Sequence, residues 1–168
     1  MTARAAEGSL VIGYGSTLRG DDGVGWHAAR LLADDPRLAG TVVLARHQLT
    51  PELALDLSRA AIAVLIDADP SKPPGTFAIE PVRRSVEPSS AWSHRLDPGA
   101  LVALAESLYG GAPDVWLVRV GVASVEIEDG LTTVVEAAVP AIVEAVVELV
   151  ARATPVAAAR STDGPADA

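Results

Sequence analysis

Short apolar runs rich in β-branched residues alternate along the chain with segments of helical periodicity. Continuous runs of this kind are typical of strands that are buried on both faces of a parallel sheet. The runs predict five strands, at residues 9–13, 41–45, 61–66, 76–79 and 115–121. The alternation favours an α/β fold, a three-layer α/β/α sandwich with a central, mostly parallel, twisted sheet of about five strands.

The other segments predict four helices, at residues 22–32, 50–59, 97–108 and 131–151. Thr50 is a favourable N-cap, and Pro51 suits the first turn of the second helix. Gly110 and Gly111 follow the third helix and end it. Pro140 lies inside the fourth helix, where its missing backbone N–H predicts a kink or a division.

The length of 168 residues and the apolar content of 49% suit one domain with a sizeable core. We assign residues 1–153 to a single α/β domain. Residues 154–168 are rich in Ala, Pro, Asp and Ser without periodicity and predict a disordered C-terminal tail. No apolar run approaches the roughly 20 residues of a membrane span, and the N-terminus has no signal-peptide core. The expected location is therefore the cytoplasm.

The chain carries 22 acidic and 13 basic side chains, which gives a formal net charge of −9. This excess disfavours a nucleic-acid surface and an anionic membrane surface, because both need basic residues. The sequence has no cysteine. Disulfides, thiolate metal sites, iron–sulfur clusters and a cysteine nucleophile are therefore excluded.

A glycine-rich acidic loop, residues 13–25, joins the first strand to the first helix. Gly15 and Gly20 have the spacing of a Walker A loop, but Asp21 and Asp22 stand where that motif has Lys and Ser or Thr. Two carboxylates would repel a triphosphate and attract a cation. Helix capping is the other interpretation of this pair, since carboxylates are favourable near a helix N-terminus.

Two further candidate positions follow predicted strands or precede a predicted helix. Asp67 ends the third strand, and His94 lies in the loop before the third helix. Ligands of such sheets bind at the carboxyl ends of the strands, so Asp22, Asp67 and His94 are expected to meet there. Two carboxylates and an imidazole suit a borderline divalent cation such as nickel or zinc. Taken singly, an aspartate such as Asp67 is more often a turn residue and a loop histidine such as His94 more often a surface residue, while Asp69 is expected to form the turn before Pro70.

Several short motifs occur in the same order as in one known family. They are the loop Gly13–Gly23, the pair Asp67-Ala68 at a strand end, the turn Pro74-Gly75-Thr76, the pair Ser93-His94 and the closing segment 117–136. With these motifs the sequence resembles the hydrogenase maturation endopeptidases over residues 10–150. The resemblance implies a protease that removes a short C-terminal extension from the large-subunit precursor of a nickel–iron hydrogenase after nickel insertion.

The resemblance also implies roles for particular residues. Asp22, Asp67 and His94 match the positions that recognise nickel, which the precursor supplies, so no organic cofactor and no permanent metal are expected. Asp21, Asp22 and Asp67 are the candidate catalytic carboxylates, with Asp21 orienting a ligand or moving a proton. The precursor is the expected partner.

The chain differs from the family in two places. Ser16 stands where the loop usually has Asn, and residues 46–52 replace a Gly-Gly-Thr type of loop. His47 and Gln48 in the second segment are candidates for contacts with a different hydrogenase substrate, although the segment could simply cap the next helix. Two other functions remain possible: an aspartate-dependent phosphatase or phosphotransferase that uses Asp67, and a noncatalytic chaperone that binds nickel or the precursor.

Overall fold

The computed structural model describes residues 8–85 and 96–153. Its five strands form one sheet in the order β2-β1-β3-β5-β4. The strands are β1 (Ser9–Tyr14), β2 (Val42–Arg46), β3 (Ile62–Asp69), β4 (Phe77–Pro81) and β5 (Asp114–Gly121). β1, β2, β3 and β5 are parallel, and β4 pairs with β5 in the antiparallel sense. The predicted mostly parallel sheet of five strands is therefore confirmed.

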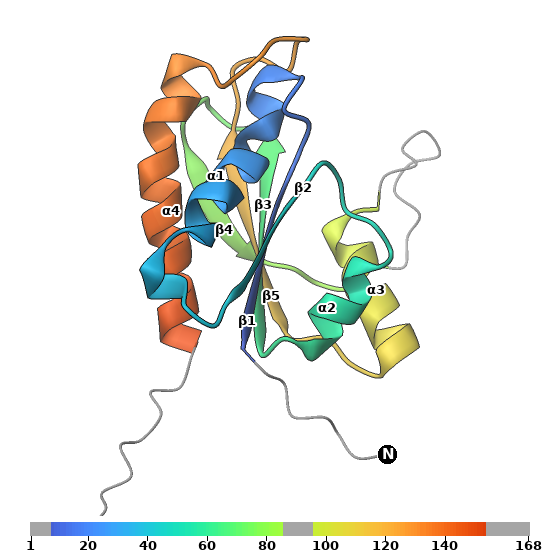
Figure 1. Cartoon of the computed structure of the whole chain (residues 1–168). Helices are drawn as coiled ribbons and strands as arrows, with labels where there is room; N and C mark the ends of the chain where they lie inside the picture. Colours follow the sequence, from blue (N-terminus) through green and yellow to red (C-terminus); the bar gives the residue numbers. More distant parts are fainter. Residues whose placement is uncertain (1–7, 86–95, 154–168) are drawn as a thin grey trace, which may run out of the picture.

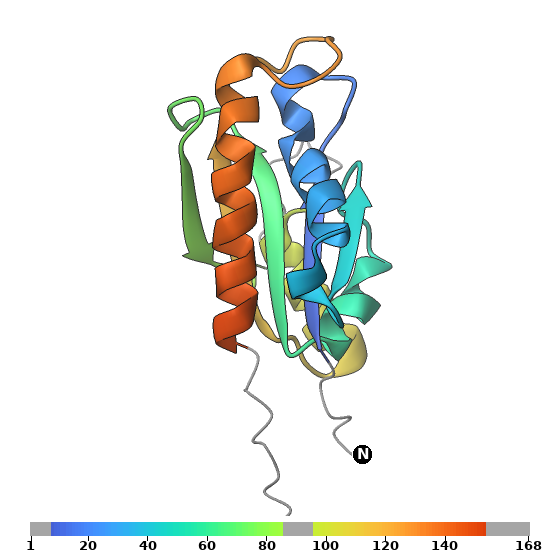
Figure 2. The same ribbon diagram turned by 60° about the vertical axis from the view of Figure 1, so that its left-hand side comes forward.

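Helices cover both faces of the sheet, which completes the expected three layers (Figure 1). α1 (Val24–Ala33) and α4 (Thr133–Ala153) pack on one face, and α2 (Leu53–Arg59) and α3 (Pro98–Tyr109) pack on the other. Two short 3-10 turns, η1 (Gly20–Gly23) and η2 (Pro36–Leu38), flank α1. Figure 2 shows α1 and α4 side by side in front of the strands.

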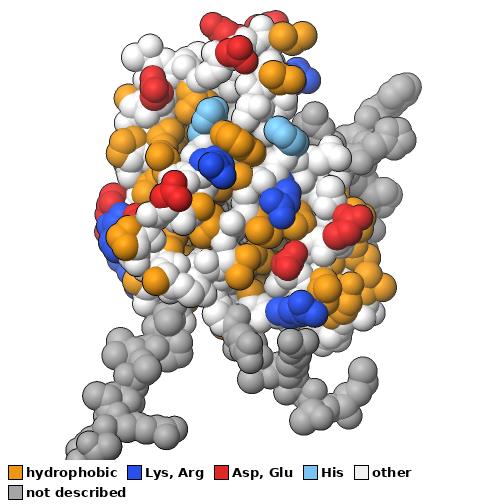
Figure 3. Space-filling view, in the orientation of Figure 1, with side chains coloured by type: hydrophobic (Ala, Val, Ile, Leu, Met, Phe, Trp, Pro, Cys, Tyr) orange, Lys and Arg blue, Asp and Glu red, His pale blue; other side chains and the backbone are white. Residues whose placement is uncertain are grey.

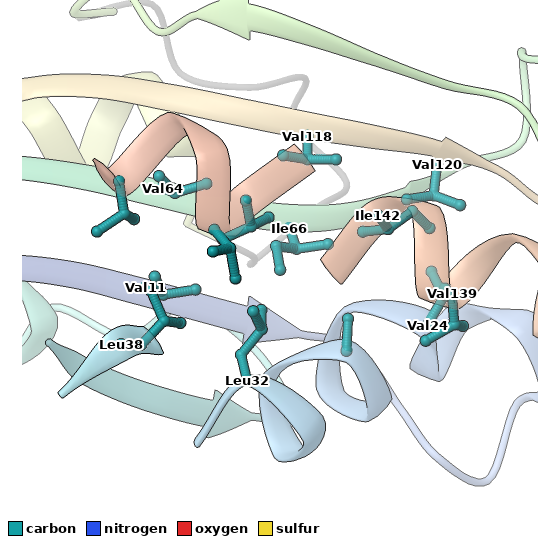
Figure 4. Close-up of a cluster of buried hydrophobic side chains, with 14 of the residues drawn as sticks. Val11, Val24, Leu32, Leu38, Val64, Ile66, Val118, Val120, Val139 and Ile142 are labelled. Carbon is teal, nitrogen blue, oxygen red and sulfur yellow. The ribbon is translucent and has the colours of Figure 1, made fainter. Parts of the chain in front are cut away.

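The sheet separates two hydrophobic cores, and β3 belongs to both because successive side chains of a strand point to opposite faces. Val64 and Ile66 face α1 and α4, where Ile142 fills the same core (Figure 4). Leu65 faces α2 and α3 and packs in the core that contains Leu101. All five of these side chains are fully buried. The strand that ends at Asp67 is thus fixed from both sides.

Two helices differ from the sequence prediction. α4 runs without division through Pro140, because Pro140 is exposed and the buried residues on either side of it, Val139 and Ile142, pack into one core. The packing outweighs the hydrogen bond that proline removes. α2 begins at Leu53 instead of Thr50, and the residues between them form a turn in which the N–H of Leu53 donates to the carbonyl of Thr50 at 3.1 Å.

α3 begins and ends as its sequence predicts. The carboxylate of Asp97 caps it by accepting a hydrogen bond from the N–H of Ala100 at 2.9 Å, and Pro98 occupies the first turn. Gly110 ends it with a φ of 81°. The predicted tail, residues 154–168, lies outside the described residues. Among the residues that the structure describes, no helix is long and apolar enough to cross a membrane.

Candidate functional site

A cavity of about 210 Å³ lies at the carboxyl ends of the parallel strands. Each of three strands contributes to it: Tyr14 ends β1, Asp67 lies near the end of β3, and His47 follows β2 directly. Asp22 reaches the cavity from η1, and Asp97 from the start of α3. The topology of the sheet therefore brings together side chains that are far apart in the sequence, as expected at this edge.

The surroundings of Asp67 in this cavity raise the pKa of its carboxyl. Burial raises its pKa to about 6, and the negative charge of Asp22 also raises it. A hydrogen bond from the Tyr14 hydroxyl to Oδ2, 2.9 Å long, acts in the opposite direction, as does the positive charge of Arg119. A carboxyl with this pKa exists in both protonation states near neutral pH, which suits it to proton transfer.

Tyr14 holds Asp67 in position. Burial, together with the neighbouring charge of Asp67 and the hydrogen bond to it, raises the pKa of Tyr14 well above its ordinary value. Tyr14 therefore stays a hydroxyl donor. Tyr14 is not among the site residues predicted from the sequence. Its position as the last residue of β1, next to the glycine loop, is the signal that could have identified it.

Asp22 lines the same cavity as Asp67 and is held by its own loop. Its Oδ2 accepts a hydrogen bond of 2.8 Å from the backbone N–H of Ser16. Because the donor is a backbone group, this contact does not need the Asn side chain that the family usually has at this position. Asp22 lies in the first turn of η1, while the N-cap positions of η1 and α1 are Arg19 and Gly23.

The side chain of Asp21 does not line the cavity. It is fully buried, and its two oxygens accept hydrogen bonds of 2.7–3.1 Å from the N–H groups of Ala123, Ser124 and Thr132 and from the Thr132 hydroxyl. Burial alone would raise the pKa of Asp21, but these hydrogen bonds lower it below the ordinary value. In the structure Asp21 fastens the segment 122–132 to η1, whereas Asp22 lines the cavity.

The structure describes only two of the three residues of the predicted nickel site. Asp22 and Asp67 share the cavity, while His94 lies outside the described residues. Within residues 8–85 and 96–153, no three His, Asp or Glu side chains lie close enough together to hold a metal ion. The candidate substrate residues His47 and Gln48 are exposed and line the same cavity.

A second cavity, of about 350 Å³, adjoins the first on the far side of Asp67. The two share Asp67, Asp97 and Pro98, so together they form a cleft that passes over Asp67. Arg119 lines the second cavity, and its guanidinium pairs with Asp69 at 3.0 Å. Asp69 also accepts hydrogen bonds from the N–H and hydroxyl of Ser71, which confirms its predicted role in the turn.

No protein-family model and no curated protein sequence matches this chain. Solved structures match it closely in fold. The hydrogenase maturating endopeptidase HybD from E. coli is 24% identical, with 86% of this chain and 93% of that chain covered and a TM-score of 0.70. The [NiFe] hydrogenase maturation protease HycI from Thermococcus kodakarensis is 18% identical, with 88% and 94% covered and a TM-score of 0.70.

A third similar structure is the hydrogenase 2 maturation peptidase from Thaumarchaeota archaeon SCGC_AB-539-E09. It is 23% identical, with 86% of this chain and 99% of that chain covered and a TM-score of 0.66. Coverage of both chains is nearly complete in all three comparisons. The chain therefore has the fold of these proteins over almost its whole described length.

Proposed function

We propose that this protein is a hydrogenase maturation endopeptidase, which removes the C-terminal extension of a nickel–iron hydrogenase large-subunit precursor after nickel insertion. The observation that carries the proposal is the cavity shared by Asp22 and Asp67 at the carboxyl ends of β1 and β3. The motifs that carry the sequence resemblance supply both carboxylates. The three solved structures with this fold, all named as hydrogenase maturation proteases or peptidases, support the same activity.

In this proposal Asp22, Asp67 and His94 contact the nickel ion that the precursor carries. Carboxylate and imidazole are suitable ligands for such a cation, and two or three of them leave coordination positions for the groups of the precursor. The nickel belongs to the substrate, so the protease recognises a loaded precursor and leaves an unloaded one uncut.

Peptide hydrolysis also needs proton transfer. A water molecule attacks the scissile carbonyl carbon and gives up a proton as the new C–O bond forms; the amide nitrogen gains a proton as the C–N bond breaks. We assign this transfer to Asp67, whose oxygen lies 2.9 Å from the Tyr14 hydroxyl in a fixed orientation. The assignment makes the enzyme an aspartyl-type endopeptidase. The cytoplasmic location stays a prediction from the sequence.

The phosphatase alternative is less compatible with the charges of the site. Asp22, Asp67 and Asp97 line the first cavity, and among the described residues that line it there is no Lys or Arg. Arg83 and Arg119 line the adjoining second cavity. Three carboxylates would repel a phosphoester dianion. Lys72, the one lysine of the sequence, pairs with Glu80 at 4.0 Å instead.

Cleavage of a purified precursor tests the proposal directly. The full chain is incubated with a nickel-loaded large-subunit precursor of a hydrogenase from the same organism, and the mass of the precursor is followed by mass spectrometry. We expect a single cut near the C-terminus of the loaded precursor and an unchanged mass for the nickel-free one. Equal cutting of both forms would contradict nickel recognition, and a stable complex without any mass change would favour the chaperone.

Variants connect the activity to the cavity. Asp22→Asn, Asp67→Asn and His94→Ala should each lower the rate of cutting at least 100-fold, on the scale of lost general acid–base or electrostatic catalysis. Asp114→Asn is the matched control, because Asp114 is an exposed carboxylate at the opposite end of the sheet. Folding is checked by circular dichroism. Normal cutting by the Asp22 and Asp67 variants would show that the cavity takes no part in cleavage.

A further inference from the structure

Two aliphatic side chains are strongly exposed beside the cleft. Leu18, between β1 and η1, is 66% exposed, and Ile127, between β5 and α4, is 90% exposed. They lie on neighbouring backbone segments, because the N–H of Glu128 donates to the carbonyl of Leu18 at 3.3 Å. Single exposed aliphatic residues are ordinary on protein surfaces. This pair is unusual in the way its backbone is held.

The two segments are fastened together by backbone hydrogen bonds. The N–H of Gly20 donates to the carbonyl of Glu128 at 2.9 Å, and the N–H of Asp21 donates to the carbonyl of Ser124 at 3.0 Å. The guanidinium of Arg19 donates to the carbonyl of Val125 at 3.2 Å. These bonds join segments about 100 residues apart in the sequence.

The buried carboxylate of Asp21 completes the attachment. It accepts the four hydrogen bonds described above from Ala123, Ser124 and Thr132. Hydrogen bonds to a charged acceptor are roughly twice as strong as neutral ones. Residues 122–132 have no helix or strand, but several hydrogen bonds fix them to the loop before α1. Leu18 and Ile127 are therefore presented on a fixed support.

The support borders the cleft. Gly15 and Asp22, at the two ends of the Leu18 loop, line the first cavity, while Leu18 and Gly20 inside the loop contact the segment of Ile127. Figure 3 shows hydrophobic and acidic side chains together at the top of the molecule, above α1 and α4. In the segment 122–132 the exposed acidic residues are Glu126, Glu128 and Asp129. We call Leu18, Ile127 and these three acidic residues the platform.

The size of the cavity shows why a protein substrate needs such a surface. The two cavities of the cleft, of about 210 and 350 Å³, are no larger than the roughly 300–1,000 Å³ pockets that enclose a drug-sized molecule. The cleft can therefore hold only a small part of a precursor protein. Specific protein complexes bury about 800 Å² on each partner. Most of the recognition surface therefore lies outside the cavity.

We propose that the platform is a docking surface for the folded body of the hydrogenase precursor. Leu18 and Ile127 enter an apolar area of the precursor, and lysine and arginine side chains around that area face Glu126, Glu128 and Asp129. Arg19, also exposed, offsets one of the three negative charges. The proposal rests on the proposed function, because it assigns the partner of that same site. It adds a contact that is separate from the nickel ligands and from the scissile bond.

Aspartate substitutions test the apolar contact. Leu18→Asp and Ile127→Asp are compared with Leu108→Asp, a matched control in which a leucine is 61% exposed near the end of α3. Leu108 is ten residues, or about 15 Å at 1.5 Å per residue, from Pro98 at the cleft. The equilibrium constant for binding the nickel-loaded precursor and the rate of its cutting are both measured, on variants with unchanged circular dichroism.

We expect the two platform variants to weaken binding at least tenfold and raise KM by the same factor, while kcat at saturating precursor stays within twofold of wild type. Leu108→Asp should change neither quantity more than twofold. Platform variants that bind like Leu108→Asp would overturn the proposal. A change in oligomeric state on Leu18→Asp would overturn it as well, because the surface would then belong to a second copy of this chain.

Charge reversal tests the acidic contact. Glu126→Lys should slow association with the precursor at least threefold at low salt and by much less at high salt, where exposed charges are screened. Asp114→Lys, at the far end of the sheet, is the control for net charge alone. Equal slowing by both variants would contradict the assigned contact.

The two readouts separate the inference from the proposed function. A wild-type protein that binds the precursor through Leu18 and Ile127 without cutting it would refute the protease and retain the docking surface. A variant with both substitutions that binds and cuts the precursor as wild type does would refute the docking surface and retain the protease. Absence of both binding and cutting would refute the two together.

Discussion

The two adjacent aspartates of the glycine-rich loop have different environments and therefore different chemistry. Asp21 is fully buried among hydrogen-bond donors that lower its pKa. Asp22 lines the cavity and contributes to the raised pKa of Asp67. The carboxylate of Asp21 therefore has a structural role, and the carboxylate of Asp22 is placed where a substrate can contact it.

Replacement of Asp21 should be costly to stability. Asp21→Ala leaves three part-buried backbone N–H groups and the Thr132 hydroxyl without their acceptor, and we expect the free energy of unfolding to fall by about 2–4 kcal/mol. Because the folded-state pKa is lowered, the contribution of Asp21 is present above its unfolded-state pKa and is lost as the pH falls through the folded-state value. Urea unfolding at neutral and acidic pH measures both effects. Asp129→Ala, exposed in the same segment, should change stability by less than about 0.5 kcal/mol.

The raised pKa of Asp67 predicts that its contribution to stability depends on pH in the opposite direction. Its folded-state pKa of about 6 lies above the ordinary 3.8, so its contribution to stability is full below the unfolded-state value and is lost as the pH rises through about 6. Asn does not titrate. We therefore expect Asp67→Asn to gain stability relative to wild type between pH 4 and pH 8, by roughly 3 kcal/mol at 1.36 kcal/mol per pKa unit.

Unfolding midpoints in urea across this pH range measure the gain. Tyr14→Phe removes a hydrogen bond that lowers the pKa of Asp67 and should move the pH-dependent region upward. A stability difference between Asp67→Asn and wild type that is the same at every pH would contradict the assigned environment of Asp67.

At the level of elements, α1 approaches the sheet through glycines. A Cβ on Gly25 would lie 2.2 Å from the carbonyl oxygen of Ile66, and one on Gly13 would lie 1.9 Å from that of Gly25. The backbone of α1 is in direct contact with the backbone of the sheet, and neither backbone can move easily to make room for a side chain. This close approach fixes the start of α1, and with it η1 and Asp22.

Gly25→Ala should therefore affect both stability and activity. We expect a loss of at least about 3 kcal/mol in the free energy of unfolding, at the upper end of overpacking effects, together with slower cutting because Asp22 is displaced. Gly111→Ala is the control, since nothing lies within 4 Å of its added Cβ and its φ is not positive; it should be neutral or slightly stabilising. An Asp22 that still supports full activity in Gly25→Ala would contradict the coupling.

Local patterns in the sequence predicted the elements well, because apolar runs and caps act over a few residues. Asp97 and Gly110 bound α3 as expected. The contacts of Asp21 with residues 123, 124 and 132 could not be predicted, since they depend on how two loops far apart in sequence meet in space. For the same reason the hydrogen bond between Tyr14 and Asp67, which positions the cavity carboxyl, has no counterpart in any local motif.

At the scale of the whole molecule, β3 links the two cores. Ile142→Ala opens a cavity on one face of the sheet and Leu101→Ala on the other; each side chain is fully buried, and each substitution should cost about 2–5 kcal/mol. Because β3 packs in both cores, we expect one cooperative urea transition with an unchanged m-value in each variant. Two separate transitions by circular dichroism would show that the layers unfold independently.

The first described strand, β1, starts and the last helix ends at the same extremity of the molecule (Figures 1 and 2). β1 runs from that extremity to Tyr14, which lines the cleft. Arg152, in the last turn of α4, has a side chain that is 79% exposed, and the sequence contains no cysteine. Arg152→Cys would therefore create a unique thiol for coupling to a sensor surface. Molecules immobilised in this way would all present the cleft and the platform to the solution, in one orientation.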